Sequence, residues 1–349
     1  MLAAALAVLG ALGVPEPRPA TRPTQEDPAP PGRLVDVDGR RMHLHALGEG
    51  SPVVVFEAGA GACSLDWALV QPEVARFTAT CSYDRAGFAW SEPGPTPRTG
   101  ERISEELHAL LRAAAVSPPY VLVGHSFGGI YVRIFREEFP AEVVGMVLVD
   151  SSHEDMQMLV GRMGGKVHLV RPRGYSDAEW ERLFEPDPDE GKGPESARAA
   201  PAPETRNAFP DPEEKLPPEV RRLRAWARSR PGYRNVDFDT REQMRVDLGR
   251  VFESRGGRSH PLGDLPLVIL TRGGRKDPPD PDVTPEQARA LDLDRERLQQ
   301  DLAGLSRIGR QVRAEASGHE IHWDEPDLVI RSVREVVEEA RRRAREGRR

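Results

Sequence analysis

The 349-residue sequence predicts an α/β fold in which a mostly parallel sheet carries helices on both faces. Short apolar runs of strand length alternate with segments whose apolar residues recur at helical spacing, the pattern of βαβ units. One run leads directly into a Gly-x-Ser-x-Gly turn that an amphipathic stretch follows. The alternation stops after Asp150 and returns at Leu265, which predicts an insertion within a single domain.

Residues 33–150 carry the first part of this core. Apolar and polar residues alternate around Asp38-Gly39, which predicts a hairpin. Continuous apolar runs, typical of buried parallel strands, then follow at Val53–Phe56, Ala79–Tyr83, Tyr120–Val123 and Val143–Val149. Two helices are predicted between these strands from the apolar residues Ile103, Leu107, Leu110 and Leu111, and from Ile130, Ile134 and Phe135.

Residues 151–262 are expected to form a helical cap over the sheet. Segments near 176–184 and 217–229 have helical spacing, and the intervening Glu185–Pro218 is rich in Pro, Asp, Glu and Ala, which predicts a mobile loop. Apolar residues in the helical segments favour a folded cap over a disordered insertion: Trp180, Leu183, Phe184, Leu223 and Trp226. Caps of this kind roof a site and shape its pocket.

The second part of the core is expected at 263–349. A strand is predicted at Leu265–Leu270, a helix through about 284–305 and a short strand at Gln311–Glu315. Pro326 is expected to open the last helix, because proline is favoured in a first helical turn. The helix ends in the basic tail Arg341–Arg349, interpreted as a solvated helix end.

Composition excludes several classes of function. The formal net charge is −7 and the pI about 5.8, which argues against nucleic acid as a general partner. The two cysteines, Cys63 and Cys81, are too few for a disulfide framework or a metal cluster, and we expect buried thiols. No cofactor or metal motif is present. The glycine-rich stretch at 57–61 lacks the Gly-Lys-Ser/Thr ending of a phosphate loop.

Residues 1–32 form an apolar leader and a proline-rich linker. Leu2–Val14 would span about 20 Å as a helix, short of a bilayer core of about 30 Å but suited to a signal peptide. No Lys or Arg precedes it, and Pro15–Pro31 then holds seven prolines. Export or membrane tethering is the preferred prediction, with a cytoplasmic location as the alternative. Oligomeric state is not predicted.

The turn at Gly124–Gly129 predicts an activated serine. Gly124 and Gly128 lack a Cβ, so a strand and a helix can approach closely around Ser126. The turn places the Ser126 hydroxyl at a helix N-terminus, where backbone N–H groups can stabilise a developing negative charge. These features indicate nucleophilic catalysis.

An activated serine needs a base, and the base needs an acid that orients it. His319, in the loop Ser317-Gly318-His319, is the preferred base, and His322 is a second candidate. Two acids remain open: Asp150, at the end of a strand, and Asp277, in a loop with Asp280 and Asp282. Asp155 is a weaker candidate.

The oxyanion hole needs two N–H donors. The Phe127 amide, directly after the serine, is the first. The second is expected from the loop Glu57-Ala58-Gly59-Ala60-Gly61, with Ala60 as the preferred donor.

Together these stretches resemble the α/β-hydrolase superfamily, in its capped serine-hydrolase branch. Tyr83–Ser91 is similar to the Asp-x-Arg-Gly-x-Gly-x-Ser loop of that family, and Gly124–Gly129 and Ser317-Gly318-His319 match its serine and histidine loops. The resemblance implies an eight-stranded sheet. Two departures stand out: Glu57-Ala58-Gly59 replaces the usual His-Gly, and the acid usual after the seventh strand is displaced to Asp277. Some relatives carry the acid at the end of the sixth strand, which favours Asp150.

Ser126 argues against the aspartate-dependent dehalogenases and epoxide hydrolases of this fold. The leading functional prediction is hydrolysis of carboxylic esters of small molecules by Ser126, His319 and Asp150. A proline-iminopeptidase-like aminopeptidase, or hydrolysis of lactones, thioesters or amides, is the alternative. A catalytically silent binding protein is the non-enzyme alternative.

Overall fold

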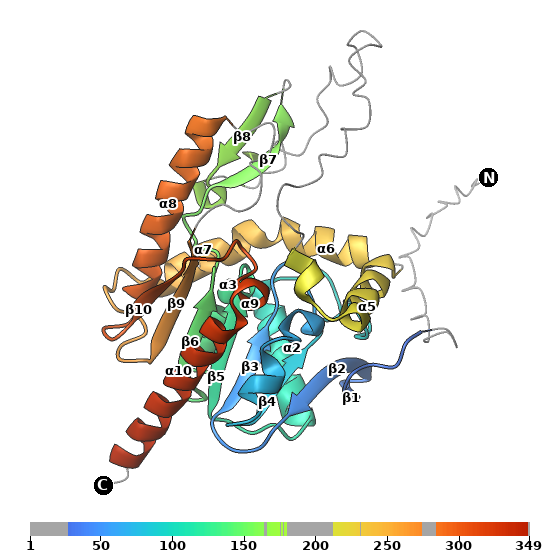
Figure 1. The fold of residues 1–349 in the computed structure, drawn as a ribbon. Helices are drawn as coiled ribbons and strands as arrows, with labels where there is room; N and C mark the ends of the chain where they lie inside the picture. The colour runs from blue at the N-terminus through green and yellow to red at the C-terminus, as the bar shows by residue number, and fades with distance from the viewer. Residues whose placement is uncertain are drawn as a thin grey trace, which may run out of the picture.

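The computed structural model describes residues 27–163, 166–174, 176, 178–179, 212–230, 232–273 and 284–347. Eight strands form one sheet in the order β1-β2-β4-β3-β5-β6-β9-β10 (Figure 1). β2 pairs antiparallel with both β1 and β4, and the remaining neighbours are parallel. The predicted mostly parallel eight-stranded sheet is therefore confirmed.

The strands of this sheet lie where apolar runs and alternation predict them. In chain order they are β1 (Arg33–Val37), β2 (Arg40–Leu47), β3 (Val53–Glu57), β4 (Thr80–Tyr83), β5 (Tyr120–His125), β6 (Val143–Val149), β9 (Leu267–Arg272) and β10 (Arg310–Ala314). The helices of the core are the 3-10 helix η1 (Ser64–Trp67), α1 (Gln71–Val74), α2 (Gly100–Ala113), α3 (Gly128–Glu138), α8 (Pro285–Ala303), α9 (Ile321–Asp324) and α10 (Pro326–Glu346).

Helices cover both faces of the sheet and bury a core on each. On one face, Leu107 and Leu110 of α2 and Phe135 of α3 belong to a buried cluster with the inner strands. On the other face, Val333 and Val337 of α10 pack in a second buried cluster. Since the central strands are buried on both faces, their sequences are largely apolar and do not alternate between apolar and polar residues.

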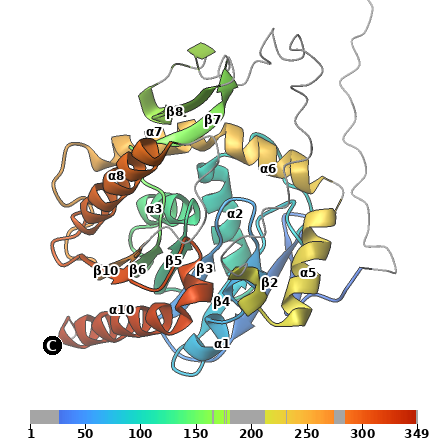
Figure 2. The same cartoon turned by 45° about the horizontal axis from the view of Figure 1, so that its top comes forward.

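The segment between β6 and β9 begins with a β-hairpin that the sequence analysis did not predict. β7 (Met158–Met163) and β8 (Lys166–Val170) pair antiparallel. The helical elements η2 (Pro172–Gly174), η4 (Pro212–Lys215), α5 (Pro218–Ser229), α6 (Tyr233–Glu242) and α7 (Met244–Arg255) follow. The hairpin lies beside α8, and Arg171 and Asp294 join the two through two 3.0 Å hydrogen bonds (Figure 2).

Several predictions concern residues outside the described part of the chain. They include the apolar run 2–14, which carries the predictions of export and tethering, most of the mobile loop, and Asp277. Among the described residues, no helix combines the length and apolar character needed to cross a bilayer. Cys63 and Cys81 are buried free thiols.

Candidate active site

Ser126 occupies the turn between β5 and α3 with a left-handed backbone, at a φ of 51°. This conformation is uncommon for a residue with a Cβ and persists where neighbours hold it. The Ser126 N–H donates to the Val149 carbonyl at 3.0 Å, and the Ser126 carbonyl accepts from the N–H groups of Ser152 at 2.9 Å and Gly129 at 3.0 Å. The strained strand–turn–helix that the motif predicts is thus present.

The glycines of this turn are required by close backbone contacts. A Cβ on Gly124 would lie 2.7 Å from the Gly128 carbonyl oxygen, and a Cβ on Gly128 would lie 2.6 Å from the Ala58 carbonyl oxygen. Both distances are shorter than any real Cβ contact, so β5, α3 and the loop after β3 can meet only where these side chains are absent.

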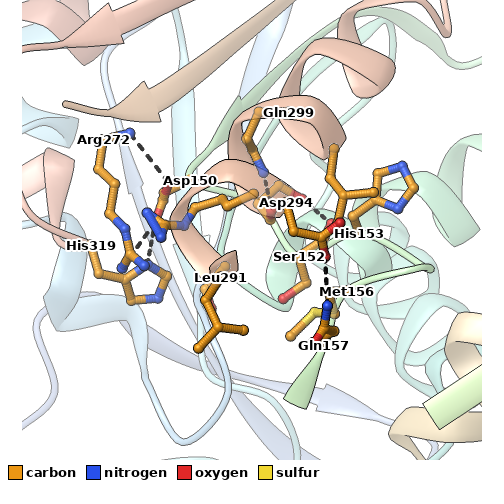
Figure 3. Close-up of a pocket in the computed structure, with 14 residues that line it drawn as sticks. Asp150, Ser152, His153, Met156, Gln157, Arg272, Leu291, Asp294, Gln299 and His319 are labelled. Atoms are coloured by element: carbon orange, nitrogen blue, oxygen red, sulfur yellow. Dashed lines mark hydrogen bonds and ion pairs between the residues drawn. The ribbon is translucent and has the colours of Figure 1, made fainter. Parts of the chain in front are cut away.

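Asp150 directly follows β6 and contacts His319 across the carboxyl edge of the sheet. Its carboxylate Oδ2 lies 2.6 Å from His319 Nδ1 (Figure 3). A carboxylate only accepts hydrogen bonds, so Nδ1 carries the proton and Nε2 is left as the basic nitrogen. Two backbone groups fix Asp150: its own N–H donates to the Leu270 carbonyl at 2.7 Å, and Oδ1 accepts from the Arg272 N–H at 3.3 Å.

Electrostatic interactions set the charge states of Asp150 and His319. Burial alone would raise the pKa of Asp150, but the hydrogen bond from His319 and the charges of His319 and Arg272 outweigh it and lower that pKa. Burial likewise lowers the pKa of His319, but the Asp150 hydrogen bond and charge reverse the effect, and the net pKa shift is upward. Asp150 is thus ionised, and His319 is a stronger base than a free imidazole.

Ser126, Asp150 and His319 line one cavity of about 290 Å³. Residues of the segment after β6 and of α8 also line it, and those labelled in Figure 3 lie to one side of the Asp150–His319 pair. In the described part of the chain, no hydrogen bond joins the Ser126 hydroxyl to His319. Such bonds are often long in the free enzyme and shorten when substrate binds.

The loop after β3 is held against the serine turn by the buried Arg85. The Arg85 guanidinium donates to the carbonyl oxygens of Gly59 at 2.6 Å, Ala58 at 2.7 Å and Ala62 at 3.3 Å. These carbonyls flank Ala60, so their bonds fix the direction of its peptide. Among the described residues, neither the Ala60 N–H nor the Phe127 N–H has a protein acceptor. Both donors remain available to an oxyanion.

The departure at Glu57 has a structural explanation in the same network. Glu57 is 1% exposed, forms an ion pair with Arg85 and accepts a hydrogen bond from the Tyr83 hydroxyl. Burial raises the pKa of Glu57. The charge of Arg85 and the hydrogen bonds from Arg85 and Tyr83 lower it again, but only in part. The carboxylate that stands in place of the usual histidine therefore serves as the counter-ion of the arginine that holds this loop.

The other predicted acids and bases lie elsewhere. Asp155 forms an ion pair with Arg173, and Asp277 lies outside the described residues. His322 is fully buried, and its ring centroid lies 4.4 Å from that of His125. Within the described residues, neither ring nitrogen of His322 has a hydrogen-bond partner, and its Nε2 lies 3.5 Å from a carboxylate oxygen of Glu320. Burial lowers the pKa of His322 well below the usual value.

His125, Glu320 and His322 form a group in the described residues whose ligand atoms all lie within 4.8 Å of one another. Burial and the neighbouring His319 lower the pKa of His125 to about 3, so both imidazoles of the group are neutral. Neutral imidazoles can bind a metal ion. His125 also donates a 3.2 Å hydrogen bond from Nε2 to the His319 carbonyl, which connects the His319 loop to the end of β5.

Sequence reasoning missed Arg272 and the polar residues of α8 that line the cavity. Arg272 ends β9, and ligands of open parallel sheets bind beyond the carboxyl ends of the strands. The position of Arg272 at the carboxyl end of a predicted strand could therefore have marked it as a candidate ligand-binding residue. The residues of α8 carry no comparable signal, because an exposed helix has many charged side chains.

Comparisons with known proteins agree with this architecture. The sequence model of the alpha/beta hydrolase family matches residues 54–332. An uncharacterised protein of Bacillus subtilis is 23% identical over 301 residues, which span 86% of this chain and 89% of that protein.

Two solved structures have the same fold. A meta-cleavage product hydrolase of Pseudomonas fluorescens superposes with a TM-score of 0.58 at 18% identity, over 88% of this chain and 98% of that one. An esterase of Thermogutta terrifontis gives a TM-score of 0.55 at 17% identity, over 88% of this chain and 97% of that one. With its family match, its sheet order and its serine turn, the chain belongs to the alpha/beta hydrolase family.

Proposed function

We propose that this protein is a serine hydrolase that cleaves carboxylic esters of small molecules through an acyl-enzyme intermediate. Ser126 is the nucleophile, His319 the base and Asp150 the acid. The observation that carries the proposal is the 2.6 Å contact between Asp150 and His319 in a cavity that Ser126 also lines. It supplies an oriented base beside a serine held in a strained turn.

In the proposed reaction, the Ser126 hydroxyl oxygen attacks the substrate carbonyl carbon while His319 Nε2 accepts the hydroxyl proton. The tetrahedral oxyanion accepts hydrogen bonds from the N–H groups of Phe127 and Ala60. The imidazolium returns its proton to the leaving alkoxide, and an acyl-serine remains. Water, deprotonated by His319, then attacks the acyl-serine and releases the carboxylic acid and the free serine.

Membership of the hydrolase family supports this proposal at the level of hydrolysis. A 2-hydroxy-6-oxo-2,4-heptadienoate hydrolase of Pseudomonas putida is 33% identical over 121 residues, which cover 34% of this chain and 44% of that enzyme. Hydrolysis of a lactone, thioester or amide would use the same residues. An aminopeptidase needs a free carboxylate for the substrate amine, and Asp294 in the cavity wall is already bound by Arg171.

Labelling with a fluorophosphonate probe tests the proposal, because the probe reacts only with an activated serine. The parent protein should be labelled, and Ser126→Ala should not. Ser152→Ala is the matched control, since Ser152 lines the same cavity without occupying the turn. A parent that resists labelling, or a Ser126→Ala variant that is still labelled, would favour a catalytically silent binding protein or another nucleophile.

A further inference from the structure

We infer, on the basis of the proposed function, that the acyl substrate carries a carboxylate and that Arg272 binds it. Arg272 is the last residue of β9, and its side chain, 19% exposed, lines the cavity with Ser126 and His319. Among the described residues, its one ion pair is a long 3.7 Å contact with Asp150, and its buried Nε has no partner. A guanidinium with unused donors thus lies beside the reacting groups.

Three other arginines of this region have carboxylate partners at hydrogen-bond distance. Arg171 forms two 3.0 Å hydrogen bonds with Asp294, and Arg133 contacts both carboxylate oxygens of Glu154, at 2.7 and 3.0 Å. Arg295 pairs with Asp292 one turn earlier on α8. Arg272 differs because its nearest carboxylate already accepts a short hydrogen bond from His319. A planar guanidinium with free donors is suited to bind a carboxylate in a bidentate manner.

The acidic groups that face the cavity do not cancel this attraction. Asp150 is 3% exposed and engaged by His319. Asp294 is neutralised by Arg171 and by Arg297 at 3.2 Å. The guanidinium of Arg295 also lines the cavity, where Asp292 pairs with it. Each of these carboxylates thus has a closer cationic or imidazole partner than Arg272, which leaves the Arg272 guanidinium able to bind an anion.

The apolar part of the lining indicates what separates the carboxylate from the scissile bond. Met156, Leu291 and Leu298 contribute hydrocarbon surface to the same cavity as Arg272. Apolar walls with a few placed polar groups fix the orientation of a small ligand. The fitting substrate class is an ester of a short aliphatic acid with a second, free carboxylate, such as a monoester of a dicarboxylic acid.

Three phosphonate 4-nitrophenyl esters of equal chain length test this inference. One ends in a carboxylate, one in the methyl ester of that carboxylate and one in a trimethylammonium group. The measurement is the second-order rate of 4-nitrophenolate release on labelling of Ser126. The parent should react fastest with the carboxylate probe. Arg272→Gln should lower the carboxylate-to-methyl-ester rate ratio about 10- to 100-fold, the value of a charge-assisted hydrogen bond.

Arg307→Gln is the matched control. It also removes one positive charge, but Arg307 is exposed and paired with Asp264 away from the cavity, so the ratio should stay that of the parent. A parent that prefers the methyl ester or ammonium probe, or an Arg272→Gln variant with an unchanged ratio, overturns the inference while leaving the serine hydrolase in place. A parent that none of the probes labels overturns the proposed function itself.

Competition keeps the test decisive if Arg272→Gln does not fold. Glutarate should slow labelling of the parent by the methyl ester probe, whereas its neutral analogue glutaramide should not. Equal effects of the two compounds would show that the cavity does not select a carboxylate.

Discussion

Replacing Asp150 by Asn tests the contact on which the proposed mechanism depends. Asn keeps the shape of the side chain but removes its charge, and it can present an N–H to His319 in place of a carboxylate oxygen. The 2.6 Å bond that holds the proton on His319 Nδ1 is then lost, and the ring is free to adopt the tautomer in which Nε2 carries the proton. Such a ring cannot accept the Ser126 proton.

The expected loss of kcat in Asp150→Asn follows from the strength of the Asp150–His319 hydrogen bond. The bond is charge-assisted and lies at a position that is 3% exposed, so solvent does not replace it. The same change in the Ser-His-Asp template of serine proteases lowers kcat by about 10⁴, and we expect about 10³- to 10⁴-fold here. Turnover of a short 4-nitrophenyl ester measures it.

The pH profile gives a second, independent readout. Asp150 raises the pKa of His319 above its ordinary value of 6.5, and the base must be neutral, so activity rises with pH through that raised pKa. In Asp150→Asn the hydrogen bond and charge that raise the pKa of His319 are lost, whereas burial still lowers that pKa. The acid limb of kcat/KM should therefore move to lower pH while its plateau falls.

Asp277→Asn is the control, because Asp277 is the other acid that the sequence allows. It should keep turnover and the pH profile close to those of the parent. A large loss in Asp277→Asn with little loss in Asp150→Asn would refute the reasoning from the observed contact. Equal thermal unfolding midpoints in the two variants would exclude a folding defect as the cause.

Three further predictions concern the support of the site. Gly124→Ala places a Cβ 2.7 Å from the Gly128 carbonyl oxygen and should cost about 1–3 kcal/mol of unfolding free energy in a urea titration, with slower probe labelling; unchanged stability would contradict the packing argument. Arg85→Met leaves Glu57 buried without its cation and should cost about 3–5 kcal/mol by the same titration, and adding Glu57→Gln should restore part of the loss.

The third concerns Asp247, whose pKa burial raises to about 7. Because the pKa of Asp247 is higher in the folded than in the unfolded protein, its contribution to stability is complete below about pH 4 and is lost as the pH rises through 7. Asp247→Asn cannot ionise, so its unfolding free energy should rise relative to that of the parent by up to about 4 kcal/mol between pH 4 and the range above 7. A difference between the two unfolding free energies that stays constant with pH would contradict this prediction.

The sheet and the serine turn were predictable because their signals are local. Val53–Phe56 of β3 and Val143–Val149 of β6 are apolar runs because both faces of these strands are buried, and such burial is visible in the sequence. Gly124 and Gly128 are likewise fixed by contacts with immediate neighbours and with one loop. Pro326 opens the last helix as expected, since proline suits a first helical turn.

The elements between β6 and β9 were harder to predict because they are stabilised from outside. Arg171, just after β8, bonds to Asp294 of α8, which lies far along the chain. α7 packs through Met244, Leu248 and Val251 in a cluster with α3, whereas its Val246 and Phe252 are exposed. The regular spacing that marks an isolated amphipathic helix is thus blurred.

The sequence favoured Asp150 over Asp277 only through the family resemblance, because the contact of Asp150 with His319 depends on strand order. β9 is the neighbour of β6, so the Leu270 carbonyl and the Arg272 N–H can hydrogen-bond to Asp150 at the end of β6. These bonds hold the Asp150 carboxylate in contact with His319. Asp150 also has a left-handed backbone, at a φ of 40°, as Ser126 does one strand away. Two strained residues with side chains at adjacent strand ends persist only where the surrounding sheet fixes both, and strain of this kind clusters at functional sites. Part of the stability of the sheet therefore offsets the backbone strain at Ser126 and Asp150, and both side chains are held in place without substrate, as the proposed mechanism requires.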